Sequence, residues 1–516
     1  MLKLVQLTKE NVQQFTSKSV CVFEPKPSYF SELIEEFDFK PDVKLCIKQV
    51  NKKRQKMGFD YYQTNIQVFD YSYIKDIDIT QYTLLITDGY YKEVFEKVQH
   101  TLGEDIEMNV YFYANHDTKL YLQYKEKYKN NELEDIIIFR SGPAAGTDCE
   151  AFDFTDNSKA LFDYMIVEGY NEKYELVWLV NYPEKYKDIE KIHNVKFLSV
   201  KAATTDKIEE RDEYYRVLCL AKYIFTTDAY GFAREARETQ VRVQLWHGCG
   251  FKTRINFVAC GNRYEYTTVI SNLYSDIHKE IFGLCDEQML VTGYAKQDWV
   301  FNGCDMNLKK QMNISDNSKI ILWLPTFRKS VKSMSYAENI GTDSDTGLPL
   351  IYDISTLQAL NEYLKSRNVV IIIKTHPIQD DSVISIGNLS NIQIISKEWL
   401  ISERLNINQL FSQTDALISD YSSGAVDYML ADKPMAFTLD DVEEYEASRG
   451  FVFDNICEWL PGKEIRNYDD MCEFVDMISA GEDYDREKRR SLRAKMHKYN
   501  DGNSCRRIIE ALGIER

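Results

Sequence analysis

Residues 416–434 read ALISDYSSGAVDYMLADKP, and a second short apolar run, Met435–Phe437, follows directly. The stretch passes from a run of strand length, Ala416–Ser419, through polar residues into a helical run, Ala425–Ala431. A strand, a helix and a second strand in this order predict parallel pairing, because parallel strands need a crossover connection.

Short apolar or β-branched runs alternate with helical patterns along the rest of the chain. Apolar residues at Val94, Phe95 and Val98 predict an amphipathic helix over Tyr91–Leu102. The other predicted strands are Val20–Phe23, Gln67–Phe69, Thr83–Thr87, Asn109–Tyr113, Asp135–Phe139, Leu176–Val180, Val195–Leu198, Tyr223–Thr226, Val241–Trp246, Lys319–Leu324, Val369–Lys374 and Ile392–Ile395. We therefore expect an α/β fold with parallel sheets and crossover helices.

The predicted strands fall into three groups, which indicate three α/β units. The units are residues 1–130, 131–305 and 306–516. We expect linkers at Lys125–Asn131 and Asn302–Asn313, and a surface loop at Ser330–Gly347. Two consecutive doubly wound units with a cleft between them can hold a nucleotide and a second substrate. The first unit lacks a G-x-G-x-x-G fingerprint, so the sequence assigns it no ligand.

The composition excludes several classes of protein. The 516 residues carry 63 basic and 81 acidic side chains, and a net charge of −18 argues against a nucleic-acid partner. No apolar run approaches the ~18 residues that cross a bilayer, and MLKLVQLTKENVQQF at the start lacks a secretory signal. The cysteines form no C-x-x-C pair and the histidines no H-E-x-x-H motif. We therefore expect reduced thiols, a cytoplasmic location and no metal.

Ligands of open α/β sheets bind beyond the carboxyl ends of the strands, and polar residues cluster at four such ends. The strand Val241–Trp246 runs into the sequence HGCGFK, which begins with His247 and ends with Lys252. A histidine at a glycine-flanked strand end is exposed to the cleft, and its neutral form can remove a proton from a hydroxyl. The alternative is a turn histidine bonded to the backbone.

The other three strand ends carry groups suited to phosphate. They are Thr326 and Arg328 after Lys319–Leu324, His376 after Val369–Lys374, and Asp420, Ser422 and Ser423 after Ala416–Ser419. A guanidinium fork and hydroxyls bind phosphate oxygens, and serines that start a helix combine with free backbone N–H groups. The alternatives are a surface arginine, a structural histidine before a proline, and capping serines, of which the last is compatible with anion binding.

The motifs occur in a specific order: QLWHGCGFK (244–252), LPTFRK (324–329), KTHP (374–377), SDYSSGAVDYMLADKP (419–434) and DDVEEYEASRGFVFD (440–454). In this order and spacing they resemble the bacterial CDP-glycerol glycerophosphotransferase family, the teichoic-acid primases and polymerases. DFTDNSKALFDYMI (153–166) resembles the opening helix of the family's first Rossmann-like half, and HKYNDGNSCRRI (497–508) resembles its ending. The resemblance covers roughly residues 135–512.

The resemblance implies a GT-B fold, in which two Rossmann-like domains face a cleft, preceded here by an extra N-terminal α/β unit. Residues 131–305 would form the acceptor side, and residues 306–516 would bind the CDP-alditol. The implied reaction transfers glycerol phosphate or ribitol phosphate to a hydroxyl of a lipid-linked or glycan acceptor and releases CMP. It serves teichoic-acid or related surface-polymer synthesis and needs no metal or other cofactor.

The family's motifs also imply roles for single residues. His247 would be the general base, and His376 would be a second catalytic histidine in contact with the donor's phosphates. The implied donor site comprises Thr326, Arg328, Ser422, Ser423, Asp420, Asp427 and Arg449. Lys252 and Asp298 are further cleft candidates.

Three positions depart from the family's pattern. Cys249 stands where threonine or serine is usual, and Gly250 stands where proline is usual. In GYAKQD (293–298), Lys296 takes the place of the arginine in a Gly-Pro-Arg-x-Asp pattern. These changes lie on the acceptor-facing half, so they bear on the identity of the acceptor.

Two other functions stay open from the sequence. The first is a sugar transferase or epimerase that uses a nucleotide sugar on the same GT-B scaffold, because a fold does not fix a function. The second is a catalytically silent nucleotide-binding scaffold in a surface-polymer assembly. The presence of both His247 and His376 argues against the scaffold, which needs neither.

A basic segment near the C-terminus predicts peripheral contact with the inner face of the cell membrane. Residues 486–498 contain Arg486, Lys488, Arg489, Arg490, Arg493, Lys495 and Lys498, against Glu487 alone. Basic residues near an anionic leaflet contribute about 1 kcal/mol each. The alternative is a solvated helix whose charges offset the acidic remainder of the chain.

Overall fold

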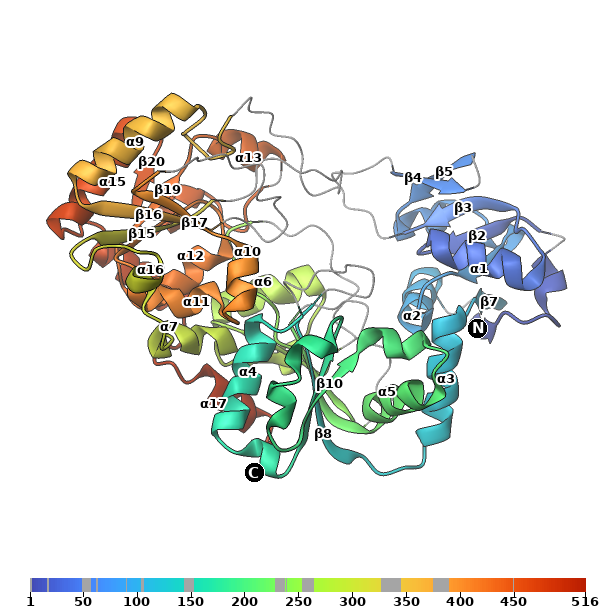
Figure 1. Cartoon of the computed structure of the whole chain (residues 1–516). Coiled ribbons are helices and arrows are strands. Elements are labelled where there is room, and N and C mark those ends of the chain that lie inside the picture. The colour runs from blue at the N-terminus through green and yellow to red at the C-terminus, as the bar shows by residue number, and fades with distance from the viewer. Residues whose placement is uncertain are drawn as a thin grey trace.

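The computed structural model describes residues 2–15, 18–48, 57–61, 64–89, 91–103, 106–142, 153–227, 237, 239–252, 264–325, 345–374, 389–448 and 450–516. Three sheets lie within these residues, and each falls inside one of the three ranges expected from the sequence. In Figure 1 the unit of the second sheet (green) lies between the blue N-terminal unit and the orange C-terminal unit.

The first sheet has the strand order β1-β7-β6-β2-β3-β5-β4. Its strands are β1 (Leu2–Gln6), β2 (Val20–Phe23), β3 (Val43–Ile47), β4 (Met57–Tyr61), β5 (Thr64–Phe69), β6 (Thr83–Ile86) and β7 (Met108–Phe112). The β4–β5 pair is antiparallel, and the other pairs are parallel. Helices α1 (Pro27–Phe37) and α2 (Tyr91–Leu102) pack on opposite faces, as expected for a doubly wound sheet.

The second and third sheets are parallel throughout the described residues. The second has the order β10-β9-β8-β11-β12-β13-β14, and the third has the order β17-β16-β15-β18-β19-β20. The second sheet comprises β8 (Glu134–Arg140), β9 (Glu175–Val180), β10 (Val195–Ser199), β11 (Ala221–Thr226), β12 (Val241–Gln244), β13 (Tyr266–Val269) and β14 (Met289–Val291). The third comprises β15 (Lys319–Leu324), β16 (Val369–Lys374), β17 (Ile392–Ile395), β18 (Ala416–Ser419), β19 (Met435–Thr438) and β20 (Lys463–Ile465).

Helices cover these sheets because their apolar faces complete the cores. Trp178 of β9, for example, is fully buried, and its ring packs against Phe139 of β8 and Phe162 of α4. The helices are α3 (His116–Tyr128), α4 (Asp156–Val167), α5 (Ile208–Leu220), α6 (Asn272–Phe282), α7 (Asp298–Asn302), α8 (Leu308–Gln311), α9 (Ile354–Ser366), α10 (Lys397–Ser402), α11 (Ile407–Leu410), α12 (Ser423–Tyr428), α13 (Val442–Ser448), α14 (Ile456–Trp459), α15 (Tyr468–Ala480), α16 (Arg486–Met496) and α17 (Ser504–Ala511).

Helices α3 and α17 each pack into the core of a unit other than the one in whose predicted range they fall. Tyr124 of α3 stacks on Tyr215 of α5 at 4.4 Å between ring centroids, so the end of the first range packs on the second unit. Helix α17 returns to the second unit, where Cys505, Ile508 and Ile509 join its core. Packing therefore places α3 and α17 in the middle unit (Figure 1).

Three local expectations need correction. The predicted linker Lys125–Asn131 begins inside α3, and the second predicted linker, Asn302–Asn313, contains α8. Strand β12 ends at Gln244, earlier than the predicted Val241–Trp246, because the backbone turns at Trp246. Most of the predicted surface loop Ser330–Gly347 lies outside the described residues.

In the described part of the chain, no helix has both the length and the apolar character to cross a membrane.

Candidate active site

The loop that follows β12 carries His247 in a backbone conformation that is rarely adopted. Trp246 has φ of 57°, in the left-handed region, which is uncommon for a bulky residue. Gly248 has φ of 149°, which side-chain-bearing residues rarely adopt. Such backbone persists only when its surroundings hold it, and it is concentrated at functional sites.

Side chains hold the backbone on both sides of this turn. The Trp246 N–H donates to Gln244 Oε1 at 2.9 Å, and Asn157 Nδ2 donates to the Trp246 carbonyl at 2.6 Å. Lys296 Nζ donates to the His247 carbonyl at 2.6 Å. The His247 ring lies 4.2 Å from the Trp246 ring between centroids and is half-buried. The position of His247 is therefore fixed through its main chain.

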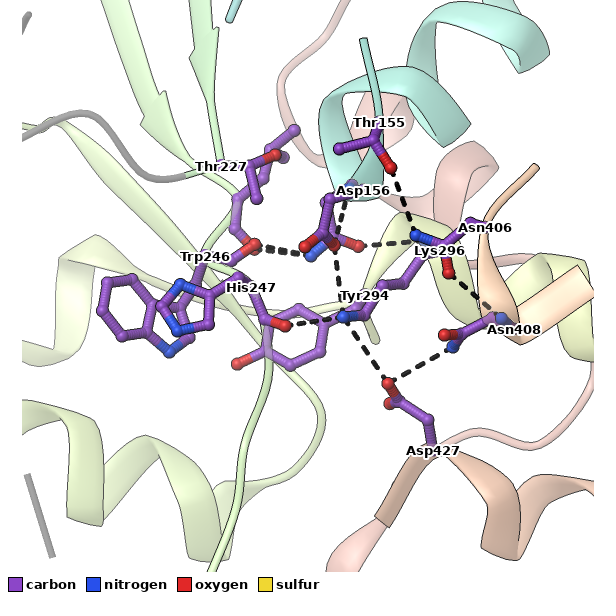
Figure 2. Close-up of polar contacts among 12 residues, drawn as sticks. Thr155, Asp156, Thr227, Trp246, His247, Tyr294, Lys296, Asn406, Asn408 and Asp427 are labelled. Carbon is purple, nitrogen blue, oxygen red and sulfur yellow. Dashed lines mark hydrogen bonds and ion pairs between the residues drawn. The ribbon is translucent and has the colours of Figure 1, made fainter. Parts of the chain in front are cut away.

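Lys296 lies at the centre of a cluster that joins three elements (Figure 2). Besides the His247 carbonyl, its ammonium contacts Asp156 Oδ1 at the start of α4 at 3.1 Å and Asp427 Oδ2 in α12 at 3.6 Å. The Lys296 N–H donates to Asn157 Oδ1 at 2.9 Å, so this asparagine links Lys296 to Trp246. We call Asp156, Asn157, Lys296 and Asp427 the lysine cluster.

Burial shapes the charges in the lysine cluster. Burial raises the pKa of Asp156, and the nearby Lys296 ammonium opposes that shift without cancelling it. Burial works to lower the pKa of Lys296, but Asp156 and Asp427 outweigh it and raise the pKa. The lysine therefore stays charged, so its ammonium can donate to the His247 carbonyl and form ion pairs with both carboxylates.

Asp427 is expected at the donor site, but the structure gives both of its carboxylate oxygens protein partners. Gln297 Nε2 donates to Oδ1 at 2.8 Å, and Asn408 Nδ2 donates to Oδ2 at 3.3 Å. The side chain is only 3% exposed. Asp427 thus ties α12 to the middle unit, because Gln297 and Lys296 both belong to that unit.

The His247 loop also lies directly against the start of α12. An ideal Cβ on Gly248 would lie 3.0 Å from Ser423 Oγ, and one on Gly250 would lie 3.4 Å from Ser423 Cβ. Farther along the loop, the Val452 N–H donates to the Phe251 carbonyl at 2.9 Å. The glycines of this loop therefore allow the second and third units to approach each other closely.

The structure also places Ser422, Ser423, Asp420 and Lys252, four of the other predicted residues. Ser422 caps α12 by accepting from the Gly424 N–H at 3.3 Å, and Ser423 is half-buried opposite Gly248. Asp420 is fully buried directly after β18. Lys252 forms an antiparallel bridge with Phe451. Thr326, Arg328, His376 and Arg449 lie outside the described residues.

Asp298, the remaining predicted cleft residue in the described part of the chain, lies against the start of α17. Its two carboxylate oxygens accept from the Ser504 and Cys505 N–H groups at 2.7 and 2.8 Å. Asp298 therefore caps α17, because a carboxylate satisfies N–H groups that have no partner in the first helical turn.

The basic segment 486–498 is also less available than its sequence suggests. Arg489 is completely buried, and its guanidinium contacts Asp483 at 2.6 Å and Asp432 at 3.5 Å. Arg490 and Arg493 also contact Asp432. Arg489 thus cannot touch a membrane surface, which corrects its assignment to that contact. Lys488, Lys495 and Lys498 stay exposed.

Asp156, Asn157, Gln297 and Asn408 were not singled out by the sequence motifs as site residues. Asp156 and Asn157 do lie in the motif DFTDNSKALFDYMI, but an acid and an amide at a helix start are also ordinary caps. In the described residues, no group of three or more His, Cys, Asp or Glu side chains could hold a metal ion.

Comparison with known proteins relates this arrangement to one family. Residues 147–513 match the model of the CDP-Glycerol:Poly(glycerophosphate) glycerophosphotransferase family. Over 331 residues, the chain is 28% identical to the teichoic acid ribitol-phosphate polymerase TarK of Staphylococcus aureus, with 60% of each chain covered. It is 27% identical to the teichoic acid glycerol-phosphate primase of Bacillus subtilis, over 52% of this chain and 66% of the primase.

The chain covers 60% of the length of TarK and 55% of the S. aureus ribitol-phosphate polymerase TarL. A solved structure of a histidine-to-alanine variant of the wall teichoic acid polymerase TagF matches with a TM-score of 0.59 at 19% identity. The match covers 82% of this chain and 96% of the TagF chain. This likeness shows the fold alone and agrees with the expected GT-B-like pair of domains. The family match spans both units that meet at His247, and the chain belongs to the CDP-glycerol:poly(glycerophosphate) glycerophosphotransferase family.

Proposed function

We propose that this protein transfers glycerol phosphate or ribitol phosphate from a CDP-alditol to a hydroxyl acceptor and releases CMP. The observation that carries the proposal is the family match over residues 147–513, which includes both sides of the contact between His247 and α12. The relatives are named for the same class of reaction, since they include ribitol-phosphate polymerases and a glycerol-phosphate primase.

In the proposed reaction, His247 removes the proton from the acceptor hydroxyl. The acceptor oxygen then forms a bond to the phosphorus that carries the alditol. The bond from that phosphorus to the oxygen of CMP breaks, and CMP leaves with the electron pair. The proton stays on His247 until it passes to solvent.

The donor side of the proposed site is built around Ser422 and Ser423, whose hydroxyls lie at the start of α12. The family's motifs add Thr326, Arg328, His376 and Arg449 to this side. Fixed donors of this kind stabilise charge that moves onto the leaving phosphate. No metal or other cofactor is part of the proposal.

The acceptor is proposed to be a lipid-linked or glycan hydroxyl, as in teichoic-acid or related surface-polymer synthesis. Such an acceptor fits a cytoplasmic protein that contacts the inner face of the membrane peripherally. The exposed Lys488, Lys495 and Lys498 are the proposed contact residues.

Incubation of the protein with CDP-glycerol, CDP-ribitol and UDP-sugars, each with a short hydroxyl-terminated acceptor, tests the proposal. We expect CMP release with one CDP-alditol and an acceptor mass increased by one alditol phosphate. Turnover of a UDP-sugar in place of a CDP-alditol would favour a sugar transferase or epimerase. Donor binding with no CMP release from any donor would favour a nucleotide-binding scaffold.

A further inference from the structure

Lys296 makes three polar contacts that lead to three different parts of the proposed site. Its ammonium lies 2.6 Å from the His247 carbonyl, 3.1 Å from Asp156 and 3.6 Å from Asp427. The contact with the His247 carbonyl is a hydrogen bond, and the contacts with Asp156 and Asp427 are ion pairs. The Lys296 side chain is 9% exposed and touches no other described carboxylate within ion-pair distance.

The first contact fixes the proposed base. His247 lies between Trp246, with φ of 57°, and Gly248, with φ of 149°. Asn157 holds the Trp246 backbone by donating to its carbonyl. Asn157 in turn accepts from the Lys296 N–H at 2.9 Å. Lys296 therefore supports this turn twice, through its side chain and through Asn157.

The third contact reaches the donor side. Asp427 lies one helical turn after Ser423 in α12, and Ser423 approaches Gly248 closely. A single ammonium thus joins the loop that carries His247 to the helix that begins with the proposed donor hydroxyls. A displacement of α12 relative to the loop would change the contacts of Lys296 with both.

We propose that Lys296 is a positioning residue that orients His247 and couples it to the donor-binding helix α12. The inference rests on the proposed function. It does not make Lys296 a catalytic residue, because its ammonium acts on the main chain of His247 and not on a substrate.

The experiment compares Lys296→Met with the control Lys159→Met. Lys159 is another largely buried lysine of the same unit. Its ammonium pairs with Asp163 at 2.6 Å and forms no ion pair or hydrogen bond with the described residues of the His247 loop. We expect Lys296→Met to lower kcat for CMP release by about 100-fold, the size of effect that misplacement by about 1 Å produces. The KM for the CDP-alditol should change less than threefold, and Lys159→Met should keep the wild-type kcat.

Two further variants separate positioning from a general loss of structure. Lys296→Arg keeps the charge and should recover kcat to within tenfold of wild type, which loss of packing alone would not predict. In a His247→Ala background, Lys296→Met should lower kcat by less than a further threefold, since a residue that acts through His247 has no further effect once the imidazole is gone. If the double variant instead shows the full loss of kcat expected from both single variants together, the inference is overturned.

If Lys296→Met does not fold, the double variant Lys296→Met/Asp156→Asn replaces it, because it removes one of the two carboxylates left without a cation. Asp427 keeps Gln297 and Asn408 as partners. A folded variant with wild-type kcat contradicts the inference, provided that the wild type releases CMP. A wild type that releases no CMP from any donor contradicts the proposed function instead.

Discussion

The lysine cluster and a second buried ion cluster contain similar chemistry but lie in different places. In the first, Lys296 contacts Asp156 and Asp427. In the second, Arg489 of α16 contacts Asp483 and Asp432. Both cations are buried, and both contact two carboxylates.

The remaining contact of each cation distinguishes the two clusters. Lys296 also donates to the carbonyl of His247, in the turn that carries the proposed base. Arg489 also donates to the carbonyl of Asp432, which has φ of 51° and ends a short helical turn after α12. A buried ion pair therefore does not mark a catalytic site by itself, and what it holds decides its role. We expect Lys296 to control turnover and Arg489 to control stability.

Replacement of Arg489 by Met should have the largest effect on stability. It removes the fully buried partner of Asp483 and Asp432, which keep only the more exposed Arg486, Arg490 and Arg493 among the described residues. Breaking a buried ion pair costs about 3–5 kcal/mol. Urea denaturation measures the loss, and the kcat of the folded fraction should equal that of the wild type. The control is Arg490→Met, because the Arg490 side chain is 48% exposed and an exposed ion pair contributes little. We expect this variant to lose little of the free energy of unfolding. A loss of kcat in folded Arg489→Met would erase the distinction between the clusters.

A pH series tests His497, which follows α16 and lies against α12. Its Nε2 contacts the Val426 carbonyl at 2.9 Å, and burial lowers the pKa of His497 to about 4 despite Asp427 nearby. The unfolded chain binds the proton below its ordinary pKa of about 6.5, whereas the folded chain does not until about pH 4. Neutral His497 therefore contributes fully to the free energy of unfolding above pH 6.5, and this contribution is lost as the pH falls toward 4. The contribution is about 3 kcal/mol at most.

The variant His497→Gln should show a shallower loss of unfolding free energy between pH 6.5 and 4 than the wild type. Glutamine can still donate to the Val426 carbonyl but does not titrate. Equal slopes for the two proteins in this pH window would show that His497 is not buried in its neutral form.

Replacement of Gly248 by Ala tests the close approach of the His247 loop to α12. The methyl group would lie 3.0 Å from Ser423 Oγ, at a φ that costs about 1–3 kcal/mol for a non-glycine residue. We expect a loss of that size in unfolding free energy and a fall in kcat of more than tenfold. Gly481→Ala is the matched control, since Gly481 has φ of 74° but no atom within 4 Å of its ideal Cβ. Comparable kcat losses in both variants would contradict a specific role for this contact.

The smallest expected effect concerns membrane association. Each exposed basic residue near an anionic leaflet contributes about 1 kcal/mol, and salt weakens this contribution. The triple variant Lys488→Gln/Lys495→Gln/Lys498→Gln should bind anionic vesicles less tightly than the wild type in co-sedimentation at low salt. A wild type that stays in the supernatant at low salt would exclude α16 and its end as a membrane contact.

Much of the fold follows from the sequence because buried parallel strands are continuous apolar runs. The predicted strands Lys319–Leu324 and Val369–Lys374 and the predicted helix Tyr91–Leu102 are confirmed to the residue. The prediction missed β1, β3, β4, β13, β14 and β20. Of these, β13 (Tyr-Thr-Thr-Val) and β14, a strand of three half-buried residues, form no clear apolar run. The turn at Trp246 was also missed, since tertiary contacts and not local sequence hold it.

The candidate site was only partly predictable for a related reason. His247 and Ser423 follow predicted strands, and the rule that ligands bind at the carboxyl ends of strands identifies both. Lys296 donates to a residue 49 positions away, and its neighbour Gln297 donates to one 130 positions away. No local pattern encodes such pairs. They appear only when α4, the His247 loop and α12 are brought together by the fold.

The rate of CMP release by His247→Ala tests the central claim most directly. With the CDP-alditol that the wild type uses, removal of a general base should lower kcat by about 10²–10⁴-fold. The melting temperature and the calorimetric affinity for the donor should stay close to those of the wild type. Transfer at nearly the wild-type rate by folded His247→Ala would contradict the account, because the lysine cluster would then hold in place a residue that the reaction does not need.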